Sequence, residues 1–567
     1  MLVRVRGVGW GAAAGLRFVA VVLVSGLLVA VAVLGSRATA RVAAVLDENW
    51  RGSYDILITA PGQGFSAVAT GGLVDSNFVA TAGEGGISVA DLARIRAIAG
   101  VEVAAPIGMV GSLRQQAFTP FLFVRDDVDY GQEITEPLVS AMPSDDLLMR
   151  VTATTVLLAA DGSDEQVVSQ GTGRVWLRAR PKGELWDFEV VYGLGSSMGF
   201  MPIVQGTGFR VPLGALPTFA SSVLAVDPVA EAQLWGDEYA VFLEPLAELS
   251  ESSAAPTGRE VSDAWVDFMC RGSGVTPGVG FPCSLQSSMI NTAVREAENT
   301  ETAPALVVPL VVNQGAGRDL VLRVEVAVTD QDVSGKDLDQ SFLDTLTNAD
   351  FVPYSVSELD VSAVTSPFSS PDLMVLLPGS QPAGNDWGVF ATETALTPML
   401  VGRPDYETVV APSGEVAFEV VPGDVVGSDG LTMQESGMAE WGMDIGVGLV
   451  RAYRSTVKTG AATGALPAPL GVFSLDVLVD PNAGDVSYVP VGYSSQVDTW
   501  QVLDSGERLP VLANLSGVDF ITMAPGAFTD LLGGAALRGA TPIDAIRVRV
   551  AGITGYTPEA QQRIIDV

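Results

Sequence analysis

Short runs of apolar residues, separated by glycine, proline and other turn-forming residues, recur along most of the chain. In the run Asp319–Val328 (DLVLRVEVAV), apolar side chains alternate with Arg323 and Glu325, which is typical of a β-strand with one face in water. Further runs of this kind are Tyr54–Thr59, Arg174–Arg180, Asp187–Tyr192 and Glu415–Val421. Because no fixed period relates the runs, the pattern predicts a β-rich fold without the repeats of a propeller or solenoid.

A helix is predicted to begin after Ser88, because Ser88 and Asp91 have the spacing of a capping box. We expect it to run until Gly100, a residue type suited to ending a helix. Its apolar face would carry Leu92, Ile95 and Ala99.

The strands Tyr54–Thr59 and Val101–Val110 flank this helix in the sequence. The three elements together predict a split β-α-β unit, with a glycine-rich stretch at Pro61–Gly86 between the first strand and the helix. Because a few predicted helices occur among many predicted strands, the sequence favours an α+β, β-rich fold class.

The last residues predict a strand followed by a second helix. Ala545–Ile553 (AIRVRVAGI) alternates like a strand, and Thr557 and Pro558 are suited to the N-cap and the first helical position. The apolar stripe of this helix, Ile564, Ile565 and Val567, reaches the final residue. We therefore expect the sequence to be a truncated form of a longer protein.

The N-terminus predicts a membrane segment. Phe18–Gly35 contains eighteen residues without a charge, which as a helix would span about 27 Å, close to the apolar thickness of a bilayer. The first 46 residues hold five arginines and no acid, and arginines before the apolar run place the N-terminus in the cytoplasm. The alternative is a signal peptide cleaved after Ala38-Thr39-Ala40. Either interpretation places the bulk of the chain outside the cytoplasm.

The composition excludes several classes of protein. With 31 basic and 66 acidic residues, the 567-residue chain has a formal charge of −35, which argues against nucleic acid as a partner. It contains no histidine, which excludes histidine-based triads and histidine-ligated zinc sites. We therefore expect a protein that is not an enzyme and has no cofactor. A carboxylate-dyad enzyme, such as a glycosidase, is the last of the alternatives.

Two cysteines, Cys270 and Cys283, are the only candidate site residues. They lie thirteen positions apart in a segment rich in glycine and proline, and the predicted compartment is oxidising. We expect a disulfide that closes a surface loop and stabilises the fold by roughly 3 kcal/mol. The spacing excludes a C-x2-C redox or zinc motif.

Three other segments resemble ligand sites but favour simpler interpretations. The residues Asp330, Asp332, Ser334 and Gly335 open like a calcium loop, but Asp337 and Ser341 occupy positions that need an apolar residue and a glutamate. A turn is therefore expected there. The methionines 433, 438 and 443 with Trp441 favour packing or an interaction over Cu(I) binding. Gly193–Gly199 is expected to be a turn and not a phosphate loop.

Five segments occur in an order known from one protein family. They are Arg17–Gly35, Asp91–Pro106 (DLARIRAIAGVEVAAP), Ser222–Trp235 (SVLAVDPVAEAQLW), Ser487–Tyr493 (SYVPVGY) and Pro542–Val567 (PIDAIRVRVAGITGYTPEAQQRIIDV). Together they resemble the MacB/FtsX-like ABC transporter permeases, in particular the long actinobacterial members with a VDP-x-x-E-x-x-L stretch. The three C-terminal membrane helices of that family, which hold the FtsX signature, are absent from this sequence.

The resemblance implies a domain organisation. Residues 1–17 would be cytoplasmic and residues 18–36 a transmembrane helix. Residues 37–112 would form the first porter-like β-α-β unit, residues 113–540 a β-rich extracytoplasmic insertion, and residues 541–567 the start of a second porter-like unit.

The resemblance also implies a function and partners. Such a permease works in the cell membrane with a cytoplasmic ABC ATPase and, as a dimer, with a second permease copy. The permease itself has no ATP site, and this chain has no G-x4-GK[ST] loop. The outer domain would couple ATP-driven motion to substrate export or to an envelope partner. The alternative function is that of a single-span or secreted β-rich binding or structural protein of the envelope.

Overall fold

A computed structural model describes the chain in segments. These are residues 54–60, 82, 85–116, 121–124, 146–157, 168–182, 185–192, 201–202, 209–212, 219–235, 240–251, 306–314, 319–329, 331–365, 367, 374–376, 393–397, 399–404, 406–412, 414, 416–420, 425–427, 449–451, 453–458, 465–474, 500–503, 505–510, 515, 517–518, 523–555 and 557–567. Their strands and helices form a β-rich α+β fold, as the sequence predicts.

The largest sheet of the described residues has eight strands. In spatial order they are β1 (Ile56–Thr59), β25 (Ala545–Val550), β2 (Val101–Gln116), β9 (Phe219–Val226), β24 (Ala527–Asp530), β10 (Leu306–Asn313) and β21 (Ala465–Phe473), with β14 (Glu393–Thr397) beside the second half of β2. The sheet therefore combines strands from nearly the whole length of the chain.

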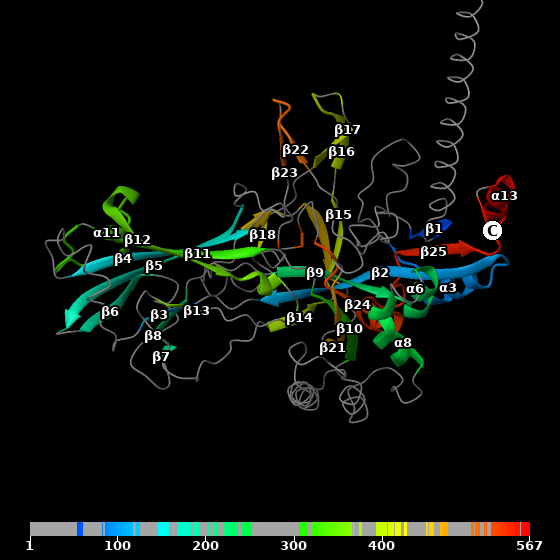
Figure 1. The fold of residues 1–567 in the computed structure, drawn as a ribbon, viewed down its shortest axis with the longest axis horizontal. Coiled ribbons are helices and arrows are strands. Elements are labelled where there is room, and N and C mark those ends of the chain that lie inside the picture. Colours follow the sequence, from blue (N-terminus) through cyan, green and yellow to red (C-terminus); the bar gives the residue numbers. More distant parts are fainter. Residues whose placement is uncertain are drawn as a thin grey trace, which may run out of the picture.

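The second sheet is antiparallel and has five strands. Its order is β12 (Phe351–Asp360), β11 (Leu320–Thr329), β4 (Leu147–Leu157), β5 (Val168–Lys182) and β6 (Leu185–Tyr192). A four-stranded sheet contains β13 (Met374–Leu376), β3 (Phe121–Val124), β8 (Phe209–Pro212) and β7 (Met201–Pro202). Figure 1 shows the five-stranded sheet at one end of the molecule, and β1 and β25 at the other.

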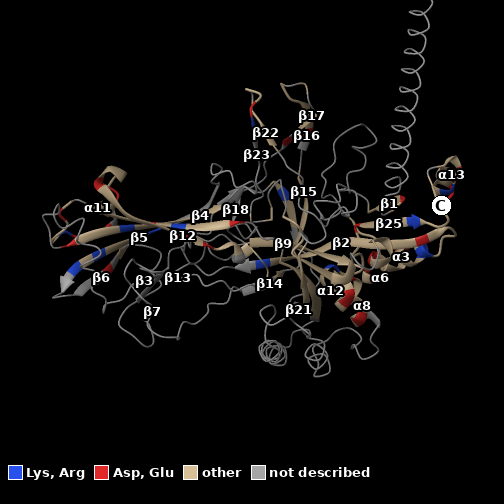
Figure 2. Ribbon diagram, in the orientation of Figure 1, with Lys and Arg blue, Asp and Glu red and all other residues tan. Residues whose placement is uncertain are grey.

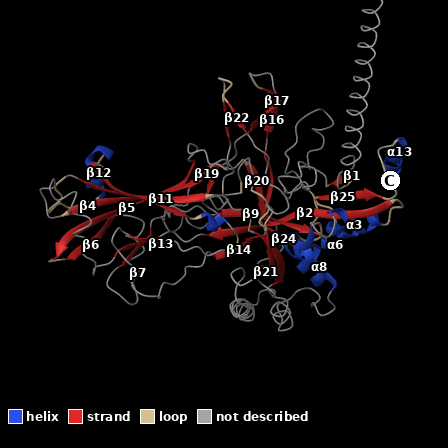
Figure 3. Ribbon diagram, viewed as in Figure 1, coloured by secondary structure: helices blue, strands red, loops and turns tan. Residues whose placement is uncertain are grey.

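Strand pairs and helices complete the described fold. The pairs are β15 (Met399–Pro404) with β20 (Arg454–Lys458), β16 (Tyr406–Val410) with β17 (Val416–Val420), β18 (Val425–Gly427) with β19 (Leu449–Arg451), and β22 (Trp500–Val502) with β23 (Arg508–Pro510). The helices are α3 (Val89–Arg96), α6 (Pro228–Trp235), α8 (Glu244–Glu251), α11 (Gln340–Leu343), α12 (Leu531–Arg538) and α13 (Pro558–Asp566), with 3-10 turns η2 (Val241–Leu243), η3 (Asn348–Asp350) and η4 (Ser362–Thr365). Figure 3 shows α3, α6 and α8 gathered at the end of the large sheet.

Two β-α-β connections interlock in the large sheet. Strands β1 and β2, with α3 between them in the sequence, both run antiparallel to β25, which lies between them. Strands β24 and β25, with α12 between them, are parallel to each other and are separated by β2 and β9. Each connection therefore encloses at least one strand of the other, which ties the ends of the described chain into one sheet.

Helices cover both faces of this sheet. On one face, Val103 and Ala105 of β2 pack against Ala230 and Leu234 of α6. On the opposite face, Ala104 of β2 packs in a cluster with Leu92 of α3. The side chains of a strand alternate between the two faces, so β2 and β25 need apolar residues on both.

Close packing of α12 on the sheet depends on glycine. A Cβ atom at Gly534 would lie 2.6 Å from Ala225 Cβ, nearer than two carbon atoms can approach without one moving. Alanine is the better helix former by about 1 kcal/mol, but overpacking of a tight contact costs about 1–3 kcal/mol. We expect Gly534→Ala to lower the melting temperature and Leu532→Ala, at a position 63% exposed in the same helix, to leave it nearly unchanged. A raised melting temperature for Gly534→Ala would contradict the packing.

The predicted starts of two helices and the predicted alternation in one strand are confirmed. Ser88 and Asp91 form the capping box of α3, and Thr557 and Pro558 begin α13. In β11, Leu322, Val324 and Val326 are buried as the alternation predicts.

The predicted end of α3 is wrong. The helix ends at Arg96, because Ala97 caps it, and a further turn leads to Gly100, which has a positive φ of 98°. Ala99 is exposed and does not extend the apolar face of the helix.

No helix among the described residues is long and apolar enough to cross a bilayer. The predicted transmembrane helix, residues 18–36, lies outside the described residues and stays a prediction.

Candidate functional site

The candidate site surrounds α6, which begins where β9 leaves the sheet. Asp227 precedes Pro228, and its Oδ1 accepts hydrogen bonds from the amides of Val229 and Ala230, each 3.1 Å long. An aspartate before a proline is well suited to this place, because it satisfies amides that the helix leaves unbonded while proline fixes the first turn.

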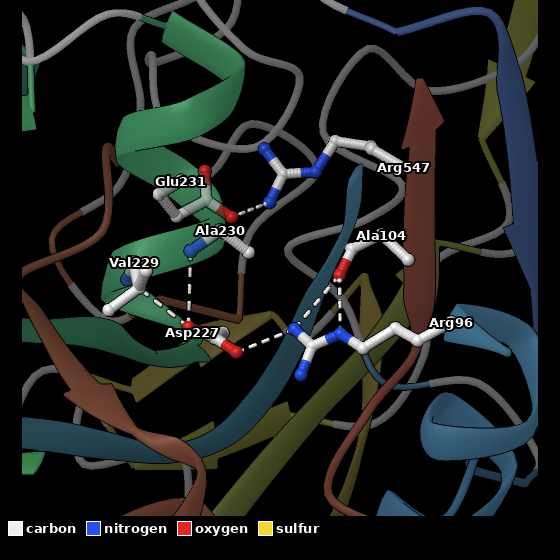
Figure 4. Close-up of polar contacts among 7 residues, drawn as sticks. All are labelled: Arg96, Ala104, Asp227, Val229, Ala230, Glu231 and Arg547. Atoms are coloured by element: carbon white, nitrogen blue, oxygen red, sulfur yellow. Dashed lines mark hydrogen bonds and ion pairs between the residues drawn. The ribbon is translucent and has the colours of Figure 1, made fainter. Parts of the chain in front are cut away.

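Arg96, from α3, joins Asp227 to the edge of β2. Its Nη2 lies 2.5 Å from Asp227 Oδ2 and donates to the carbonyl of Ala104 over 3.0 Å, and its Nε donates to the same carbonyl over 3.2 Å (Figure 4). Strand β9 pairs with β2 only as far as Val226, which lies opposite Ile107. The guanidinium therefore bonds a strand carbonyl just beyond the end of that ladder.

Glu231 and Arg547 form an ion pair between α6 and β25 (Figure 4). Each side chain is 1% exposed. Two buried charges cost several kcal/mol to desolvate, and only their mutual attraction and hydrogen bonds offset this cost. The pair therefore fixes the middle of α6 to β25 and tolerates the loss of neither partner.

Arg549, two residues further along β25, bonds the end of α6. Its guanidinium donates to the carbonyls of Gln233 over 3.0 Å and Leu234 over 2.5 Å. Carbonyls at a helix C-terminus carry partial negative charge and attract cations. Arginines from α3 and β25 thus contact α6 at its start, its middle and its end.

A second network lies where α12 returns to β25. Asp544 is fully buried, and its Oδ2 lies 2.6 Å from Arg538 Nη1 and accepts a 2.8 Å hydrogen bond from the amide of Met109. Arg538 also donates to the carbonyls of Met109 and Gly85. This aspartate therefore holds the end of α12, the start of β25 and the middle of β2 together.

Tyr54, at the start of the described chain, should make the stability of the protein depend on pH. Burial raises the pKa of its phenol, and the charge of Arg547 offsets part of this rise. The folded state favours the neutral phenol, so its contribution to stability is full below about pH 10 and is lost as the pH rises through the higher folded-state pKa. We expect Tyr54→Phe to remove this part of the alkaline loss of stability in thermal unfolding. An equal alkaline loss in both proteins would contradict the burial of the phenol.

The arrangement connects elements and does not resemble a reaction centre or a binding site for polyanions. Arginines and carboxylates engage each other and backbone carbonyls, and the described residues contain no group of three acids or cysteines that could hold a metal ion. In Figure 2 the basic positions of the described part are scattered among acidic and uncharged ones. These contacts attach α6 to both α3 and β25.

The sequence-predicted site residues do not contribute to this network. Cys270 and Cys283 lie outside the described residues, as do the methionine patch with Trp441 and the segment Gly193–Gly199. Their predicted roles stay predictions.

The segment that resembles a calcium loop is described from Gln331 onward, so Asp330 lies outside the described residues. The described part is a turn. Asp332 is exposed and accepts a 2.9 Å hydrogen bond from the amide of Ser334, and Val333 is fully buried. Arg178 donates to the carbonyls of Val333 and Lys336. The carbonyls of Val333 and Lys336 therefore accept hydrogen bonds from a guanidinium, and the loop is a turn packed on the sheet.

Comparisons of the chain with protein-family models, curated proteins and solved structures find no match.

Sequence reasoning named the segments of the network but missed its residues. Glu231 stands in the mainly apolar helix PVAEAQLW, and Arg547 stands among the apolar residues of a strand that is buried on both faces. The single charge of Glu231 in that helix is the signal that could have pointed to a buried partner, because unpaired buried charges are not tolerated.

Proposed function

We propose that the chain is a membrane-anchored subunit of an ABC transporter with a MacB/FtsX-like extracytoplasmic domain. Residues 18–36 would cross the bilayer, and the following residues would lie outside the cytoplasm. The chain would work with a cytoplasmic ATPase and a second permease copy. Motion of the membrane helices would be passed to the outer domain, which moves a substrate or engages an envelope partner.

The observation that carries the proposal is the convergence of three segments. Three of the five segments that carry the resemblance supply every side chain of the network around α6: Asp91–Pro106, Ser222–Trp235 and Pro542–Val567. The contact of Arg96 with Asp227 spans 131 positions of sequence, and that of Arg547 with Glu231 spans 316. Segments that carry the resemblance therefore lie together in the fold, which supports reading them as one part of a domain of this family.

The arrangement of the described termini supports the same proposal. Strand β1 follows the predicted membrane helix in sequence and is a hydrogen-bonded neighbour of β25. Strand β25 leads to α13, and Figure 1 shows α13 and the C-terminus at the same end of the molecule as β1. In a permease, both connections to the membrane would then pull on one strand pair. The first porter-like unit, residues 37–112, would contain β1, α3 and most of β2, and the second would begin with β25 and α13 in residues 541–567. Residues 113–540 would form the insertion.

The topology can be tested on the chain in its native cells. We expect the protein in membranes that have been washed with alkaline carbonate, and we expect its N-terminal peptide to include the apolar run Phe18–Gly35. A soluble protein that begins after Ala40 would contradict the anchor and favour the secreted envelope protein.

A further inference from the structure

Helix α6 is held by two ion pairs that differ in their access to water. The side chains of Glu231 and Arg547 are 1% exposed, whereas those of Arg96 and Asp227 are 39% and 20% exposed. Salt screens an exposed pair strongly and a buried pair only weakly. The two contacts should therefore respond very differently to ionic strength.

The exposed pair stands at the end of a strand ladder. Strands β2 and β9 pair from Gln115 opposite Phe219 as far as Ile107 opposite Val226. Beyond that point the carbonyl of Ala104 is bonded by Arg96. When Arg96 leaves, water can take its place at this edge, so separation need not leave a buried polar group without a partner.

The exposed pair also connects helices on opposite faces of the sheet. Leu92 of α3 packs on the face that carries Ala104, and α6 packs on the face that carries Val103. In α6, Asp227 keeps its bonds to the amides of Val229 and Ala230 independently of Arg96, because these bonds use its other oxygen. The helix start therefore survives the loss of Arg96.

We propose that Arg96 and Asp227 form a salt-sensitive clasp whose opening releases α3 from α6 while Arg547 and Arg549 keep α6 on β25. In the closed state the clasp joins the helices of the two faces across the end of the sheet. In the open state α3 moves relative to α6, without unfolding of the sheet. The inference stands on these contacts and does not require that the chain take part in transport.

Hydrogen exchange of the full chain in detergent tests the clasp. Measurements at about 0.01 M and about 1 M salt change the screening length from about 30 Å to about 3 Å. We expect amides of α3 to exchange about threefold faster at high salt, consistent with the modest strength of an exposed pair. Amides of β25 should keep the same exchange rate.

Two variants and one matched control complete the test. Arg96→Gln and Asp227→Asn should show the fast exchange of α3 already at low salt, and asparagine should preserve the start of α6 because it is an equally good N-cap. Arg94→Gln is the control, since Arg94 lies in the same helix and pairs with Asp91 at the surface. It should retain the salt effect. Equal exchange in Arg96→Gln and Arg94→Gln, or acceleration of β25 together with α3, would overturn the clasp.

Discussion

Arg547→Met is expected to destabilise the large sheet by about 3–5 kcal/mol, the usual cost of leaving one partner of a buried ion pair without the other. Methionine fills a similar volume, so the loss comes from the uncompensated charge of Glu231 and not from a cavity. Hydrogen exchange of the β25 amides measures this change as a lower free energy of opening. A lower free energy of opening in the variant would show that the ion pair stabilises the packing of α6 on β25.

A double variant tests whether the lost stability comes from the unpaired charge of Glu231. In Glu231→Met with Arg547→Met no buried charge is left, so most of the lost stability should return. Arg323→Met is the matched control, because Arg323 pairs with Glu358 at the surface, with side chains 39% and 53% exposed. It should cost less than about 1 kcal/mol. If the double variant is no more stable than Arg547→Met, the account of the pair is wrong.

Asp544→Ala is expected to destabilise the protein by about 3–5 kcal/mol, because it leaves the 6%-exposed guanidinium of Arg538 without its counter-charge. It also removes the acceptor of the Met109 amide in the middle of β2. The loss should appear as a lower melting temperature and as faster exchange of the amide of Met109.

The control for this prediction is Asp566→Ala. Asp566 is exposed in α13 and accepts a hydrogen bond from Gln562. Removing it should change stability by no more than about 0.5 kcal/mol. Equal melting temperatures for the two variants would show that Asp544 does not hold α12, β25 and β2 together.

Local structure could be predicted from the sequence because its causes lie within a few residues. Ser88 with Asp91, and Thr557 with Pro558, define helix starts through bonds to their own first turn. The alternation of Leu322 and Val324 with charged neighbours places β11 in a sheet with one face buried. The β-rich α+β class follows from many such elements.

The pairing of charges could not be predicted, because it depends on the strand order. Arg96 reads as an ordinary exposed residue of an amphipathic helix, and its partner Asp227 is brought near only by the pairing of β2 with β9. With 31 basic and 66 acidic residues, very many pairs are possible in sequence. The alternation of β25 likewise predicts a wet face, but helices cover both faces and Arg547 is buried.

If the chain is part of an ABC transporter, an ATPase subunit should accompany it in the membrane. A tag on the N-terminus captures the protein from its native membranes in mild detergent, and the purified sample is assayed for ATP hydrolysis and for its subunits by mass. We expect a cytoplasmic ATPase with a G-x4-GK[ST] loop in a fixed ratio to the chain. A homogeneous preparation of this chain without an ATPase subunit or ATP hydrolysis would contradict the proposal.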